Sequence, residues 1–350
     1  MSLRNQVSSR PNREEKMKEH ENAPCPCESG KRYVDCCLDF HLAKSRENAA
    51  RALNEEIEKL VSGRNFDSFE AMNEFVRNYC DRQNAEPKPD FLGLSTDQIH
   101  RLIDFPFQST DDLVRLNDSF GQNDMAGIPV VDNAVRFLQA MAEVEPLKAT
   151  ATGNLARDFA KRLFDDIEQS DWKKYINFRS ETDSMTVHSL RLILTMGGWL
   201  RKAKGTFRLT RKGRKSVKAG FSAADYLDLF WTFTRKFNWG FQDGYPGLEN
   251  IQRAHLFSLL LLHKKAGEFL ENYHLGPYFV RAFPLALAES ERFRCDPYER
   301  VSRCFSVRFL ERFCAYFGLI ETKPRGEDPL DRRFFFKASP FLDKLLTWKI

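Results

Sequence analysis

The clearest fold signal in this chain is the stretch SLRLILTMGGWLRKAKGTFRLTRKGRKSV, residues 189–217. Apolar residues recur every three or four positions up to a pair of glycines, and a short alternating segment follows. A Thr-x-x-Gly sequence then opens another helical pattern. Thr210 is suited to cap that helix, and Gly213 to permit a tight turn. The stretch therefore predicts a helix, a short strand and a second helix.

Two other segments share this outline. Residues 134–164 also carry Thr-x-x-Gly, at Thr150 and Gly153, between helical patterns. A looser copy spans 307–346, with Lys337 and Pro340 where the threonine and glycine would stand. Helix, helix, short strand and turn is the outline of a winged-helix module. We therefore expect a mainly α chain with two or three winged-helix-like units, at 128–168, 184–222 and 297–350.

The other parts of the chain are less regular. At 350 residues, the chain is long enough for two or three domains. Its 31 phenylalanines exceed ordinary usage and should fill cores and helix seams. The further divisions that we expect are a disordered tail at 1–20, a small zinc knuckle at 21–42, a helical pair at 43–86, a linker with a short helix at 87–127, and a helical region at 223–296.

Composition indicates a cytoplasmic protein. Apolar residues make up 42% and charged residues 29% of the chain, and no apolar run approaches the roughly 20 residues of a membrane-spanning helix. The charged N-terminus has no apolar core of a secretory signal. Because the cytosol keeps thiols reduced, a tight group of cysteines there favours metal binding over disulfides.

Such a group is present in PCPCESGKRYVDCC, residues 24–37, which holds four of the eight cysteines. Zinc prefers four soft ligands in a tetrahedron at about 2.3 Å, and two short chelating pairs joined by a turn can supply them. No ligand position would stay open for water, so we expect one structural Zn²⁺ rather than a catalytic one. The predicted ligands are Cys25, Cys27, Cys36 and Cys37, and His41 is the alternative to Cys37.

This segment resembles the SEC-C motif, the zinc-binding element found at the C-terminus of the SecA translocase ATPase and in many bacterial proteins. The resemblance covers about fourteen residues, including Ser29, Gly30 and Tyr33 beside the cysteines. Glu28, Val34 and Asp35 depart from the usual pattern. In SecA the element docks to a chaperone and the ribosome, so the resemblance implies binding to a partner rather than catalysis.

Positive charge is concentrated in one place. Residues 201–220 carry nine lysines or arginines and no acid, although the whole chain has a net charge of only +5. In a winged helix the recognition helix enters the major groove and wing residues contact phosphates. The alternative function is therefore a nucleic-acid-binding regulator that uses the basic wing between Arg201 and Lys218. Its expected contacts are Arg208, Arg211, Lys212, Arg214 and Lys215.

Sequence motifs for enzymes are missing: the chain has no P-loop, HExxH, GxSxG or GxGxxG pattern. His255 and His263 could share a helix face but lack a neighbouring carboxylate in sequence. Cys295, Cys304 and Cys314 have no chelating spacing and should pack as small apolar side chains. The leading prediction is a non-enzymatic, zinc-binding adaptor or protein-interaction module with an unidentified protein partner and no membrane contact.

Overall fold

The computed structural model describes residues 51, 54–105, 107, 113–168, 171–290, 296–326 and 331–350. The expected tail at 1–20 and the zinc knuckle at 21–42 lie outside these residues. Within the described part, the prediction of a mainly helical chain is confirmed. Its strands are short and pair into small antiparallel sheets.

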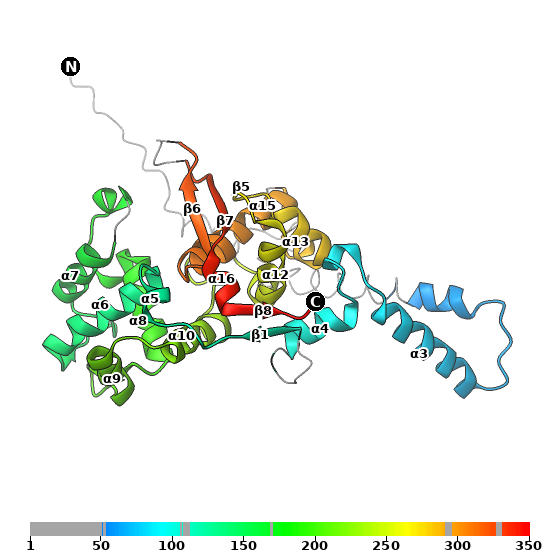
Figure 1. Cartoon of the computed structure of the whole chain (residues 1–350), viewed down its shortest axis with the longest axis horizontal. Helices are drawn as coiled ribbons and strands as arrows, with labels where there is room; N and C mark the ends of the chain where they lie inside the picture. The colour runs from blue at the N-terminus through cyan, green and yellow to red at the C-terminus, as the bar shows by residue number, and fades with distance from the viewer. Residues whose placement is uncertain are drawn as a thin grey trace, which may run out of the picture.

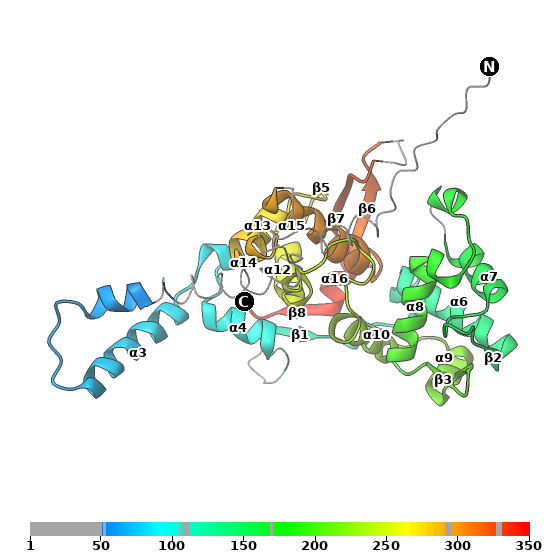
Figure 2. The same ribbon diagram turned by 180° about the vertical axis from the view of Figure 1, so that it is seen from behind.

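A helical arm stands away from the main body (Figures 1 and 2). Residues 54–61 are helical, and α3 (Phe69–Ala85) follows after a turn. The Ser68 hydroxyl caps α3, and Phe66 packs on Phe75 with ring centroids 5.4 Å apart. Phe66 lies in the turn between the two helices, so this contact ties the turn to α3, which itself buries none of its side chains. Two further elements join the arm to the body, η1 (Pro89–Phe91) and α4 (Thr96–Asp104).

Module 1, residues 129–219, packs helices on a three-stranded sheet of order β2-β4-β3. The first strand thus pairs with the last, and Leu147 lies opposite Phe207. The expected units at 128–168 and 184–222 therefore contribute to one sheet. After α5 (Gln122–Met125), the elements are α6 (Pro129–Val144), β2 (Leu147–Lys148), α7 (Arg157–Ile167), η2 (Asp171–Tyr175), η3 (Glu181–Asp183), α8 (Met185–Met196), β3 (Leu200–Ala203), β4 (Thr206–Leu209) and α9 (Arg211–Ala219).

Module 2, residues 255–345, has a sheet of order β5-β7-β6, so its first strand also pairs with its last. Two helices, α10 (Ala223–Arg235) and α11 (Asn250–Arg253), connect the modules. The elements of module 2 are α12 (His255–Lys265), β5 (Leu270–Glu271), α13 (Gly276–Ala282), α14 (Leu285–Ala288), α15 (Pro297–Phe305), the π-helix η4 (Ser306–Ala315), β6 (Ile320–Pro324), β7 (Phe334–Ala338) and α16 (Pro340–Leu345).

The turn that leads from a helix into the hairpin is the same in both modules. Before each hairpin a helix ends at a glycine with positive φ, Gly198 at 82° and Gly318 at 71°. The next residue donates its N–H to a carbonyl of the preceding helix, at 2.9 Å in module 1 and 2.8 Å in module 2. Glycine favours this closure because it reaches the left-handed region without steric cost.

The helix after each hairpin is tied back to that glycine. The Thr210 hydroxyl donates to the glycine carbonyl at 2.6 Å in module 1, and the Ser339 hydroxyl does the same at 2.5 Å in module 2. Ser339 therefore takes the structural place of Thr210, and the positions assigned from sequence, Lys337 and Pro340, lie to either side of it. The longer hairpin of module 2 hides this equivalence in the sequence.

The roles expected of the Thr-x-x-Gly sequences are confirmed only in part. Thr210 caps α9 by accepting from the N–H of Gly213 at 3.1 Å. Gly213 makes no turn: it lies in α9, where a Cβ would meet the Trp199 carbonyl oxygen at 2.4 Å. Thr150 accepts from the N–H of Asn154 within a turn and caps no helix, because α7 begins later.

Aromatic rings join the modules into one body. Tyr226 of α10 donates its hydroxyl proton to the Phe317 carbonyl at 2.8 Å, and the N–H of Val130 donates to the Tyr316 carbonyl at 2.9 Å. Each buried ring of this size contributes about 2 to 3 kcal/mol of hydrophobic stabilisation. The prediction that phenylalanines fill the core is confirmed by the buried side chains of Phe230, Phe233, Phe237, Phe313 and Phe317.

The two ends of the body meet in a separate ribbon. Strand β1 (Val114–Leu116), which follows the arm, pairs antiparallel with β8 (Leu346–Trp348) near the C-terminus (Figure 1). The side-chain amide of Asn117 donates to the Lys344 carbonyl at 3.0 Å beside this ribbon. The arm is therefore anchored to module 2 through residues far apart in the sequence.

Candidate interaction surface and cavity

The predicted zinc ligands Cys25, Cys27, Cys36 and Cys37, with His41, lie outside the described residues. Among the residues that are described, no group of three or more His, Cys, Asp or Glu side chains could hold a metal ion. The prediction that later cysteines pack as small apolar side chains is confirmed for Cys304 and Cys314, both fully buried. Burial raises the pKa of the Cys304 thiol to about 12, so it stays protonated. Cys295 lies outside the described part.

The five basic residues predicted to contact nucleic acid fall into two groups. Lys212 is engaged internally, with Nζ 2.6 Å from Asp228 and 3.4 Å from the centre of the Trp199 ring. Arg214 pairs with Glu145 at 3.0 Å. Both cations therefore stabilise the fold around module 1. Arg214 is exposed in spite of its partner, and the other three are exposed and have no acidic partner among the described residues: Arg208, Arg211 and Lys215.

Strand register adds cations that lay outside the predicted set. Arg201 of β3 stands directly opposite Arg208 of β4, and both are exposed. Lys148 of β2 lies opposite Thr206, two residues before Arg208 and therefore on the same sheet face. None of the three has an acidic partner within the described ranges. The outward face of the module 1 sheet thus concentrates positive charge on three adjacent strands.

Helix α8, which directly precedes the hairpin of β3 and β4, presents no lysine or arginine to solvent. Arg191, its one arginine, is buried and places Nε 2.6 Å from Glu181. Met196 is the exposed large apolar residue of this helix, at 42%. The surface of α8 is therefore poorly suited to insertion into a major groove. Any contact with an anion would have to be made by the sheet face and α9.

A buried ionic cluster in module 1 escaped the sequence analysis. Glu181 Oε1 lies 2.6 Å from both His188 Nδ1 and Arg191 Nε, and the carboxylate also accepts from the Leu155 N–H. Burial acts to raise the pKa of Glu181, but these donors hold it below its ordinary value. The carboxylate is thus ionised and fully used in joining α8 to the turn before α7. His188 and Arg191 follow Glu181 by seven and ten residues, and this spacing matches no metal-binding or catalytic motif in the sequence.

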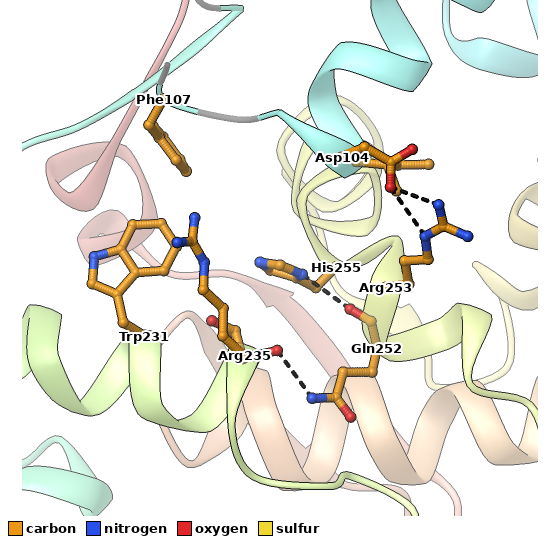
Figure 3. A pocket seen from close by; sticks show the side chains of 9 residues that line it. Asp104, Phe107, Trp231, Arg235, Gln252, Arg253 and His255 are labelled. Carbon is orange, nitrogen blue, oxygen red and sulfur yellow. Dashed lines mark hydrogen bonds and ion pairs between the residues drawn. The ribbon is translucent and has the colours of Figure 1, made fainter. Parts of the chain in front are cut away.

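A cavity of about 500 Å³ lies where α4, α10, α11 and α12 meet (Figure 3). Arg253 reaches across to Asp104, with Nη2 2.6 Å from Oδ1. The guanidinium of Arg235 covers the ring of Trp231 at 4.0 Å. Polar and aromatic groups from distant parts of the chain thus face one space. Its lining residues are Ile103, Asp104, Phe107, Trp231, Thr234, Arg235, Gln252, Arg253 and His255.

The two histidines expected on one helix face are separated by the fold. His255 is buried in the cavity wall, where its Nδ1 lies 2.9 Å from the Gln252 carbonyl oxygen. His263 is partly exposed, and its Nδ1 lies 2.9 Å from Asp343, a carboxylate that sequence spacing did not indicate. They form no joint site. His255 belongs to the cavity, and His263 belongs to the contact between α12 and α16.

No helix of the described residues is both long and apolar enough to cross a bilayer.

Comparison with protein families finds two separate segments. A model of the SEC-C motif matches residues 22–39, which confirms the resemblance stated from the cysteine spacing. A model described as the Y4jL N-terminal domain matches residues 126–222. This match begins just before α6 and ends just after α9, so it coincides with module 1. No curated protein and no solved structure matches the chain.

Proposed function

We propose that this protein is a non-enzymatic, zinc-binding adaptor whose N-terminal element docks to a protein partner. The match of the SEC-C motif to residues 22–39 carries the proposal, because that segment contains all four predicted thiolate ligands. A closed set of four thiolates leaves no site for a reacting water and suits a structural Zn²⁺. We place this function in the cytoplasm, where the thiols stay reduced.

The rest of the chain serves as a scaffold in this proposal. The zinc element precedes an arm that buries none of the α3 side chains and projects from the body (Figure 1). In this assignment, docking by the zinc element needs no change in the core of the body. We further propose that modules 1 and 2 are winged-helix-like units. Their first-with-last strand pairing and their element order support this assignment.

Elemental analysis of the purified protein tests the zinc site. We expect about one Zn²⁺ per chain, and thiolate-to-metal charge-transfer bands after substitution with Co²⁺. The double change Cys36→Ser and Cys37→Ser should abolish both signals and leave the helical body folded. Cys80→Ser, which removes a thiol on α3, is the matched control and should retain full metal. Loss of zinc in His41→Ala but not in Cys37→Ser would identify the histidine as the fourth ligand.

Docking requires its own measurement. Partners captured by the wild type should be lost in the Cys36→Ser and Cys37→Ser variant and retained in Cys80→Ser. Capture that is equal for all three proteins would refute docking through the zinc element while leaving zinc binding intact.

We propose polyanion binding by module 1 as a second candidate function. The observation that favours it is the direct opposition of Arg201 and Arg208, with Lys148 on the same face. Cations held this close repel each other, and a phosphate backbone lying across the sheet would relieve that repulsion. The contact would be insensitive to sequence, because α8 offers no exposed cation to read bases.

A titration with random duplex DNA at several salt concentrations tests this candidate. Removing one phosphate-binding cation should reduce the slope of log K against log salt by about 0.9. Arg201→Gln with Arg208→Gln should therefore reduce it by about two units. Arg115→Gln with Lys236→Gln removes the same charge elsewhere and should leave the slope near the wild-type value. Absence of binding at low salt, or equal slopes in both double variants, would eliminate the proposal.

A further inference from the structure

The cavity between α10 and α12 carries one cation that no acid neutralises. Asp104 compensates Arg253, but Arg235 has no acidic partner among the described residues. Its guanidinium is held over Trp231 instead, and partial burial lowers its pKa below the usual arginine value. A stacked guanidinium keeps its fork of N–H donors in a fixed plane, ready for a planar anion.

His255 supplies an unused acceptor on the same wall. The residue is 8% exposed, and its Nδ1 donates to the Gln252 carbonyl at 2.9 Å. Burial lowers the pKa of His255 to about 4, so the imidazole is neutral and Nε2 carries a lone pair. That nitrogen is buried and has no hydrogen-bond partner within the described part. Figure 3 shows it on the ring edge turned away from Gln252, toward the Arg235 side of the cavity.

The other polar groups of the cavity are already used. The side-chain amide of Gln252 donates to the carbonyls of Thr234 and Phe237, at 2.9 and 2.8 Å. The Thr234 hydroxyl donates to the Phe230 carbonyl at 2.8 Å. Arg235 and His255 therefore offer the free donor set and the free acceptor that a ligand would meet.

Flat apolar walls complete the site. Phe107 and Trp231 meet edge to face, with ring centroids 5.2 Å apart, and Ile103 also lines the cavity. A volume of about 500 Å³ falls within the usual range for small-molecule sites. A single uncompensated cation matches a monoanion better than a phosphate dianion. The chemistry thus favours a carboxylate on a planar ring.

We propose that this cavity binds an aromatic carboxylate whose ring also carries a hydrogen-bond donor. The carboxylate accepts from the Arg235 fork, the ring lies against Phe107 and Trp231, and the donor reaches Nε2 of His255. The residues of this site belong neither to the zinc element nor to the basic sheet face.

Calorimetric titration of the full chain with 6-hydroxy-2-naphthoate tests the proposal. We expect saturable binding of one molecule per chain. 2-Naphthoate, which lacks the donor, and 2-naphthol, which lacks the carboxylate, should each bind at least about tenfold more weakly. Inorganic phosphate alone should give no saturable binding. In ¹⁵N spectra the Nε2 signal of His255 should shift with the hydroxynaphthoate and stay in place with 2-naphthoate.

Substitutions at the cavity mouth localise the binding. Arg235→Gln should weaken binding of 6-hydroxy-2-naphthoate at least about tenfold. Arg235→Lys should also weaken it, because the fork of N–H donors is removed, but less than Arg235→Gln does, because the positive charge is kept. Lys236→Gln is the matched control, since it removes the neighbouring exposed cation outside the cavity, and should bind as the wild type does. No saturation up to about 10 mM, equal binding in Arg235→Gln, or equal binding of all three naphthalenes would overturn the proposal.

Discussion

The hairpins of modules 1 and 2 occupy equivalent places, but one carries a pair of like charges and the other a pair of unlike charges. In module 2, Glu321 of β6 stands opposite Lys337 of β7 and pairs with it at 3.1 Å. The equivalent positions in module 1, which follow the same glycine turn, hold Arg201 and Arg208. An opposed pair of unlike charges stabilises a sheet by about 0.2 to 1 kcal/mol, and a pair of like charges weakens it.

This difference shows that the arginine pair of module 1 is a property of its surface and is not required by the fold. Module 2 builds the same strand order with its charges balanced, so the sheet does not require two arginines at that position. Module 1 retains the unfavourable pair, whereas two other cations of the same module, Lys212 and Arg214, are neutralised by acids. The outward face of the sheet therefore keeps uncompensated positive charge, which supports the proposal that this face meets an anion.

The largest effect is expected at Trp199 and Leu319, the equivalent residues that follow Gly198 and Gly318. Both are fully buried, and Trp199 also donates from Nε1 to the Ser216 hydroxyl at 3.1 Å. We expect Trp199→Ala to lower the free energy of unfolding by about 4 kcal/mol and Leu319→Ala by about 3 kcal/mol. Urea denaturation measures both. Met196→Ala, at an exposed site, should stay within about 0.5 kcal/mol, and an equally small loss for Trp199→Ala would show that the modules are not packed alike.

A smaller effect on the free energy of unfolding is expected from a change of pH, because the two modules bury a histidine in different surroundings. His188 of module 1 contacts the carboxylate of Glu181, whereas His255 of module 2 is buried, has no acidic partner among the described residues and meets the positive field of Arg235. The pKa of His255 is about 4 in the folded chain and about 6.5 in an unfolded one. The unfolded state therefore binds the extra proton between these values, and stability is lost as pH falls from about 6.5 toward 4.

Denaturation at about pH 7.5 and about pH 5 measures this loss. The free energy of unfolding of the wild type should fall by about 2 kcal/mol more than that of His255→Gln over this interval. Titration of Glu181 and the other carboxyls is common to both proteins and cancels in the difference. An identical pH dependence for the two proteins would contradict the neutral, buried state of His255.

The smallest effect is expected from exchanging the charge patterns of the hairpins. Arg201→Glu recreates in module 1 the unlike pair of module 2 and should raise the free energy of unfolding by about 0.5 kcal/mol at low salt. Glu321→Arg should lower it by a similar amount. Both effects should shrink as salt screens the charges. Destabilisation by Arg201→Glu would show that the arginine pair is held by contacts within the protein rather than kept for an anion.

Local sequence rules predicted several features of the fold correctly. The Thr210 cap depends on a side chain three residues from its partner, and the burial of Cys304 and Cys314 follows from the apolar helical patterns around them. Such features require no knowledge of distant segments. Ser339 was missed because the longer hairpin of module 2 shifts it relative to Thr210, and only the hydrogen bond to the preceding turn shows their equivalence.

The candidate sites were less predictable. The sequence shows that 201–220 is basic, but not that Asp228 and Glu145 neutralise two of those cations. Those acids lie 16 and 69 residues from their partners in the chain. The cavity was missed for the same reason, since Asp104 and Arg253 are separated by 149 residues.

By itself, the sequence determined the zinc-type cysteine spacing, the helical character, the supply of phenylalanine and the local caps, because each depends on neighbours along the chain. The tertiary structure alone decided that Leu147 pairs with Phe207, which cations stay uncompensated, and where Arg235 and His255 face a common space. Long-range pairing and burial set these features, since desolvation and charge compensation depend on which distant segments pack together.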